Sequence, residues 1–166
     1  MKSIWARLAL LLIGGASVGL LSHLAAQAPK KAPAEKRIIL VAGNDPWTET
    51  DIVIYPQDKV TFKAAGKVCF SGNARESCVG PAGWPRQEYG GTWIDDYNYC
   101  EDTMSDANHA SLIGSIGGSV FYIGPEMTIE GKEGELKLGI NDCTFDGDFG
   151  NSGEFSVVVS IVRGKG

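Results

Sequence analysis

Residues 155–161 read Phe-Ser-Val-Val-Val-Ser-Ile, and every second side chain in this stretch is large and apolar. A period of two is typical of a β-strand with one buried face, because successive side chains of a strand point to opposite faces of its sheet. Residues 60–64 and 136–140 alternate in the same way. Shorter apolar runs predict further strands at 38–41, 52–55, 67–70, 112–116 and 127–130.

Turn-forming residues separate these strand candidates. They occur at Asn44-Asp45-Pro46, Pro56-Gln57-Asp58, Ser71-Gly72-Asn73 and residues 131–134. The chain also has 22 glycines among its 166 residues, and a glycine inside a helix costs about 1 kcal/mol relative to alanine. About eight short strands separated by such turns predict one all-β domain, a jelly-roll-like β-sandwich.

The first 28 residues have the pattern of a secretory leader. Lys2 and Arg7 precede an uncharged, leucine-rich run at 8–21, and an Ala-x-Ala site follows at 26–28. This pattern predicts a signal peptide over residues 1–28, although Pro29 disfavours cleavage and leaves an uncleaved membrane anchor as the alternative. In both cases the domain is expected outside the cytoplasm, secreted or periplasmic.

A linker and the folded domain are expected to follow the leader. Residues 29–36 read PKKAPAEK, a Pro/Ala/Lys composition with nothing to bury. The folded domain is therefore predicted over residues 37–166.

Export makes disulfides the expected state of the four cysteines. Three pairings of four cysteines exist, and their spacing does not match a C-x-x-C zinc pattern. The short separation favours Cys69–Cys78, which leaves Cys100–Cys143.

The charge of the chain is acidic. Its 15 basic residues fall to 13 without Lys2 and Arg7 of the leader, against 20 acidic residues. Because binding to a phosphate backbone needs dense lysine and arginine, nucleic acid is not expected as a partner. Six of the acids and no base lie in residues 87–108, which predicts a long acidic insertion, either a solvated flap or a functional loop.

Residues 138–156, LGINDCTFDGDFGNSGEFS, join two of the expected strands through a loop rich in oxygen side chains and glycine. Calcium takes about six to eight oxygen ligands from carboxylates, amides and backbone carbonyls. Glycine lets the backbone turn its carbonyls inward, so the loop is a candidate Ca²⁺ site, although its spacing is not that of an EF-hand and the same residue types are common in turns. The oxygen side chains and glycines are Asp142, Asp146, Asp148, Asn151, Gly147, Gly150 and Gly153.

Five motifs in one order resemble the PA-I-type galactophilic lectin family, over about residues 38–162. They are Ala64-Ala65-Gly66 followed by residues 67–70, Gly80-Pro81-Ala82-Gly83, residues 112–117, Gly139-Ile140-Asn141-Asp142, and Asn151-Ser152-Gly153 with residues 154–157. The resemblance implies a galactose-binding-domain-like β-sandwich with one Ca²⁺ at its tip, and this ion itself holds sugar hydroxyls.

The resemblance also implies a set of ion ligands. Asp142 and Asn151 hold the positions of side-chain ligands, and Phe70 holds that of a backbone carbonyl. A further carbonyl is expected near Asp146 or Gly147. Gly150 stands where the family has another asparagine, and Asp148 is the expected replacement.

The leading functional prediction is an exported, calcium-dependent carbohydrate-binding domain for a galactoside-like sugar. In it, Asp142 and Asn151 contact both the ion and the sugar hydroxyls. The aromatic rings expected to pack on the C–H face of the sugar are those of Trp84, Trp93 and Tyr97.

The family's sugar-contacting His-Pro element has no histidine counterpart in Trp84-Pro85-Arg86-Gln87, and the 87–108 insertion lies where the sugar rim belongs. The alternative is therefore a structural or protein-interaction module of an envelope complex, which calcium staples without binding sugar. An enzyme is not expected, because the predicted domain at 37–166 has no G-x-S-x-G motif and His109, just before an apolar run, is expected as a strand-edge residue.

Overall fold

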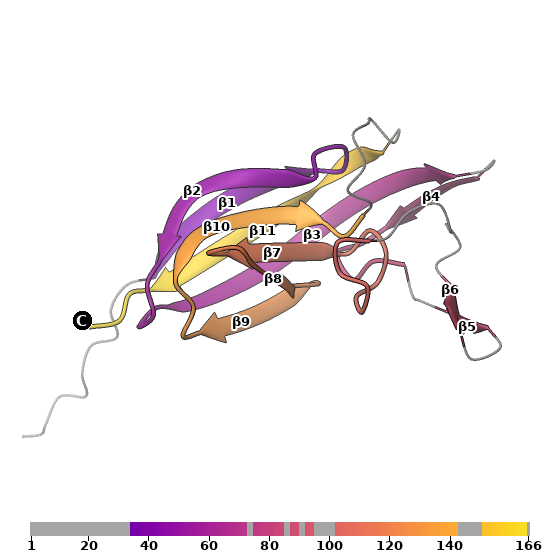
Figure 1. The fold of residues 1–166 in the computed structure, drawn as a ribbon. Helices are drawn as coiled ribbons and strands as arrows, with labels where there is room; N and C mark the ends of the chain where they lie inside the picture. Colours follow the sequence, from indigo (N-terminus) through magenta and orange to yellow (C-terminus); the bar gives the residue numbers. More distant parts are fainter. Residues whose placement is uncertain are drawn as a thin grey trace, which may run out of the picture. The chain divides into compact units, whose positions relative to one another are not determined.

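The computed structural model describes residues 34–72, 75–84, 87–89, 92–94, 102–142 and 151–165. All of them belong to one unit of the chain, residues 32–166. Their strands form two antiparallel sheets that pack face to face over a shared apolar core (Figure 1). This confirms the predicted all-β sandwich. Within the described ranges, no helix is long and apolar enough to cross a membrane.

The first sheet has the strand order β1-β11-β3-β4, and β9 pairs with the opposite end of β3 from β4. Because β11 pairs with β1 on one side and β3 on the other, the alternating stretch 155–161 lies in the middle of the sheet. The side chains of Phe155, Val157, Val159 and Ile161 are fully buried. The strands are β1 Glu35–Ala42, β3 Lys59–Gly72, β4 Arg75–Val79, β9 Glu126–Glu130 and β11 Ser152–Val162.

The second sheet has the order β2-β10-β7-β8. Its buried side chains, among them Ile54, Leu112, Leu136 and Leu138, meet those of the first sheet in one cluster. The strands are β2 Trp47–Ile54, β10 Gly134–Ile140, β7 Leu112–Ile116 and β8 Ser119–Tyr122. A separate hairpin pairs β5 Gln87–Tyr89 with β6 Thr92–Ile94.

Two of the differences from the predicted strand boundaries follow directly from the strand pairing. The strands expected at 60–64 and 67–70 are one strand, β3, because Gly66 continues the ladder with a φ of +113° where a side chain would collide with the Glu154 carbonyl. Strand β1 begins at Glu35, inside the predicted linker, because Glu35 pairs with Ile161 of β11.

The disulfide between Cys69 and Cys78 confirms one of the two predicted pairs. The two cysteines stand directly opposite each other on β3 and β4, so the strand register brings them together. Cys100 and Cys143 lie outside the described residues, as does the leader at 1–28.

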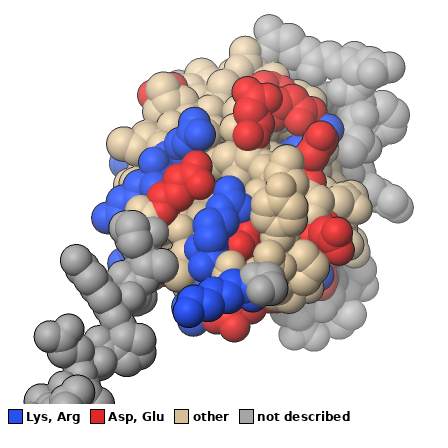
Figure 2. Space-filling model, turned by 90° about the vertical axis from the view of Figure 1, so that its left-hand side faces the viewer, with Lys and Arg blue, Asp and Glu red and all other residues tan. Residues whose placement is uncertain are grey.

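Exposed ion pairs cover part of the outer surface. Lys59 pairs with Glu130 and Lys63 with Glu126 across β3 and β9. Figure 2 shows the side that lies on the left of Figure 1, where basic and acidic side chains are interspersed. Exposed pairs of this kind each contribute about 0–1 kcal/mol, so the core and the buried polar groups account for most of the stability.

Asp58 is the buried charge that ties the C-terminal tail to the sandwich. Its side chain is 1% exposed and accepts hydrogen bonds from the Tyr55 N–H at 3.0 Å, Arg163 Nη1 at 2.6 Å and the Gly164 N–H at 3.3 Å. Burial by itself raises the pKa of Asp58, but the hydrogen bonds from Tyr55, Arg163 and Gly164 outweigh it and lower the pKa below its usual value.

We expect Asp58→Asn to lower the free energy of unfolding by about 2 kcal/mol at neutral pH, because charge-assisted hydrogen bonds are lost. A lowered folded-state pKa stabilises above the unfolded pKa of about 4, and this contribution disappears as the pH falls through the folded value. Urea unfolding at neutral and acidic pH should show a flatter pH dependence in the variant.

Glu130→Gln is the matched control, because it removes a carboxylate from an exposed pair. It should change the free energy by less than about 0.5 kcal/mol. Equal effects of the two substitutions at neutral pH would contradict the role given to Asp58.

Candidate functional site

The site lies where β10 ends and β7 begins, at one end of the second sheet (Figure 1). Pairing continues past both strands, because the Asn141 N–H donates to the Ser111 carbonyl at 2.8 Å and the Ala110 N–H donates to the Asn141 carbonyl at 2.7 Å. Ala110 has a φ of +54°, a conformation that is uncommon outside glycine. These hydrogen bonds hold the strained residue that follows His109.

The Asn141 side chain organises the segment before β7. It is fully buried, and its Oδ1 accepts the Met104 N–H at 2.8 Å. Its Nδ2 faces the carbonyls of Met104 at 3.1 Å, Ala107 at 3.4 Å and Asn108 at 3.1 Å. One amide therefore holds residues 104–108 against the end of β10, directly beside Asp142.

The Gly80–Trp84 turn supports His109 from the other side. The Trp84 N–H donates to the His109 carbonyl at 2.7 Å. Gly83 has a φ of +77°, and a Cβ there would lie 2.6 Å from the same carbonyl oxygen. Only glycine allows this approach, which explains the glycine of the Gly-Pro-Ala-Gly motif.

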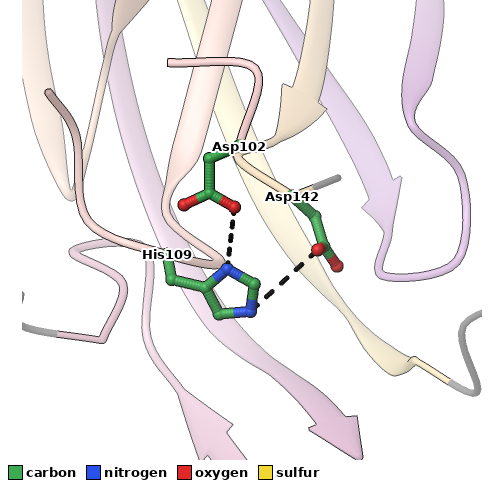
Figure 3. Close-up of side chains that lie close together, drawn as sticks. All are labelled: Asp102, His109 and Asp142. Atoms are coloured by element: carbon green, nitrogen blue, oxygen red, sulfur yellow. Dashed lines mark hydrogen bonds and ion pairs between the residues drawn. The ribbon is translucent and has the colours of Figure 1, made fainter. Parts of the chain in front are cut away.

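Three ionisable side chains from these segments converge, as Figure 3 shows. His109 Nδ1 lies 2.9 Å from Asp102 Oδ1, and His109 Nε2 lies 4.0 Å from Asp142 Oδ1. The side chains of Asp102, His109 and Asp142 are only 4%, 8% and 15% exposed. One ligand atom from each lies within 4.8 Å of the others, so the group could hold a metal ion.

Asp142 also contacts Asn151, the other side chain that the resemblance gave as a calcium ligand. Asn151 Nδ2 lies 2.6 Å from Asp142 Oδ2 and 3.2 Å from the Gly43 carbonyl oxygen. Rotation of the amide by half a turn would place its Oδ1 beside these two oxygens. These three oxygens would be part of the roughly six to eight that calcium takes.

The remaining predicted site residues are placed less completely. Phe70 lies in β3 opposite Ser77 of β4, one residue beyond Cys69, where the β3–β11 register ends opposite Ser152. Trp84 is half-buried and packs against the core, whereas Trp93 lies in β6. Asp146, Gly147, Asp148 and Tyr97 lie outside the described residues.

The sequence predicted the position of His109 at the edge of a strand but not the burial of its side chain. His109 does precede β7, but its side chain is buried and bonded to Asp102. Asp102 belongs to the acidic 87–108 segment and is seven residues from the histidine. The sequence shows one histidine in the predicted domain, close to an acidic segment, but no known motif spacing indicates which acid it contacts.

Comparison with known proteins gives partial similarities. No model of a known protein family matches the chain. The phosphoheptose isomerase of Proteus mirabilis (strain HI4320) is 31% identical over 107 residues, which are 64% of this chain and 52% of that protein. The chain thus spans about half the length of this relative. The solved structure of the EclA N-terminal domain, a PllA-like lectin, gives a TM-score of 0.47 at 22% identity, over 74% of this chain and 92% of that one.

Proposed function

We propose that this domain is an exported, calcium-dependent carbohydrate-binding domain whose ion is held by Asp142 and Asn151. The observation that carries the proposal is their contact at 2.6 Å, although residues 143–150 separate them in the chain. These are the two side chains to which the resemblance to galactophilic lectins assigns calcium. Motif and geometry therefore point to the same pair.

The donor chemistry fits calcium. Asp142 offers a carboxylate, Asn151 an amide oxygen once its amide rotates, and Gly43 a carbonyl that already lies beside Asn151. The Phe70 carbonyl, one residue beyond the end of the β3–β11 register, is the proposed fourth donor, and Gly147 and Asp148 would complete the set from the connecting loop. A bound calcium ion would supply coordination positions for two neighbouring sugar hydroxyls.

The sugar is proposed to be galactoside-like, with Asp142 and Asn151 accepting or donating hydrogen bonds to its hydroxyls. Trp84 already packs against the core, so Trp93 and Tyr97 are the aromatic residues on which the proposal relies more. Export is supported by the leader pattern at 1–28 and by the Cys69–Cys78 disulfide, since such bonds persist in oxidising compartments.

Removal of calcium is the direct test. Calcium at about one hundred times its dissociation constant should stabilise the folded protein by about 2.7 kcal/mol, seen as a rise in melting temperature that a chelator reverses. Calorimetry of the full chain with galactosides should give heat only in the presence of calcium.

Two outcomes separate the alternatives. Calcium stabilisation without binding to any member of a broad glycan array would favour the structural module of an envelope complex and end the carbohydrate proposal. If calcium gave no stabilisation and no calcium-dependent sugar binding, the proposed ion site would be excluded as well.

A further inference from the structure

Asp142 presents its two carboxylate oxygens to two different groups. Oδ2 faces the Asn151 amide at 2.6 Å and belongs to the proposed calcium site. Oδ1 instead faces His109 Nε2 at 4.0 Å (Figure 3). The neighbour of Oδ1 is therefore a nitrogen atom, a type of ligand that calcium does not favour.

The contacts of His109 determine which ring nitrogen faces Asp102 and which faces Asp142. A carboxylate only accepts hydrogen bonds, so the 2.9 Å contact with Asp102 places a proton on Nδ1. Nε2 is the ring nitrogen that faces Asp142, and it can bind a metal ion once it carries no proton. The 4.0 Å separation between Nε2 and Asp142 Oδ1 exceeds the hydrogen-bond range of about 2.7–3.2 Å. Two metal-ligand atoms at this separation are close to the spacing at which both can bind one cation.

We propose that His109 Nε2 and Asp142 Oδ1 bind a divalent transition-metal ion of the zinc type, with Asp102 as the positioning residue behind the histidine. Imidazole and carboxylate are standard zinc ligands, and a zinc-bound histidine usually donates its other N–H to a carboxylate. Nitrogen and oxygen on one tetrahedral zinc lie about 3.4 Å apart, so a side-chain shift of roughly 0.6 Å closes the site. Water or ligand hydroxyls fill the remaining positions.

This inference does not depend on calcium or sugar binding. The two sites share Asp142 but differ in their second side chain, an amide in one and an imidazole in the other. His109→Gln should therefore remove zinc binding and keep calcium binding, whereas Asn151→Ala should do the reverse.

Zinc calorimetry on the chelator-treated, non-reduced full chain is the first experiment. His109→Gln is expected to weaken zinc binding at least tenfold, and the control Asp106→Asn, at an exposed carboxylate of the segment before β7, should leave it unchanged. Asp102→Ala should weaken it about 10–100-fold, and Asp102→Asn should restore most of the affinity, because its amide oxygen still accepts the Nδ1 proton.

Cobalt substitution gives a readout that a purely structural histidine would not affect. Co²⁺ added to the wild-type chain should shift the His109 ring protons paramagnetically and produce visible absorption, even if a His109 variant fails to fold. Zinc affinity equal in wild type and His109→Gln, or unshifted His109 ring protons, would overturn the inference. Zinc binding through His109 in a protein that ignores calcium would instead overturn the proposed function alone.

Discussion

The Asn141→Ala variant is expected to lose about 3–4 kcal/mol of unfolding free energy. The Asn141 amide makes four contacts within hydrogen-bond distance to the backbone of residues 104–108 in a fully buried position. Each such bond contributes about 1 kcal/mol net, and alanine would also remove the acceptor of the part-buried Met104 N–H. Urea unfolding monitored by fluorescence measures the loss.

Asn108→Ala is the matched control for this prediction. Asn108 is half-buried, and its Nδ2 donates to the Ala82 carbonyl at 2.9 Å, so its loss should cost about 1 kcal/mol. Asn141→Asp should be at least as damaging as alanine, because it would turn a carboxylate toward three carbonyl oxygens. An Asn141→Ala variant no less stable than Asn108→Ala would contradict the organising role.

The fold was largely predictable from the sequence because its central strand carries an undisturbed period of two. Phe155, Val157, Val159 and Ile161 all face the core. Strand β8 was missed because its four residues are mostly exposed at a sheet edge, where burial imposes no alternation. The expected break in β3 also failed, since a glycine there permits close strand packing instead of a turn.

Of the candidate site, only the residues that belong to a short sequence motif could be predicted. Asp142 and Asn151 stand in two short motifs, after the end of β10 and before the start of β11, and their side chains lie together although the two strands belong to different sheets. The contact between Asp102 and His109 arises in an irregular segment whose path depends on the buried Asn141. Such tertiary hydrogen bonds leave no periodic signal in the sequence.

Asp142→Ala is expected to weaken calcium binding at least 100-fold, equivalent to about 2.7 kcal/mol. Asp142 is the one carboxylate among the described donors of the proposed calcium site, and the affinity of a calcium site falls with the charge of its ligands. Because its other oxygen faces His109, the same substitution should also remove zinc binding. Calorimetry with each ion separately measures both losses.

The control is Asp106→Ala, which removes an exposed acid from the segment before β7. It should leave both affinities within about twofold, because surface charges are screened. Three variants then form a pattern that general destabilisation cannot reproduce, because Asn151→Ala affects calcium, His109→Gln affects zinc, and Asp142→Ala affects both. Calcium affinity of Asp142→Ala within about threefold of wild type, about 0.65 kcal/mol, would place the ion away from Asp142. The contact between Asp142 and Asn151 would then be a structural hydrogen bond that closes the ends of β10 and β11.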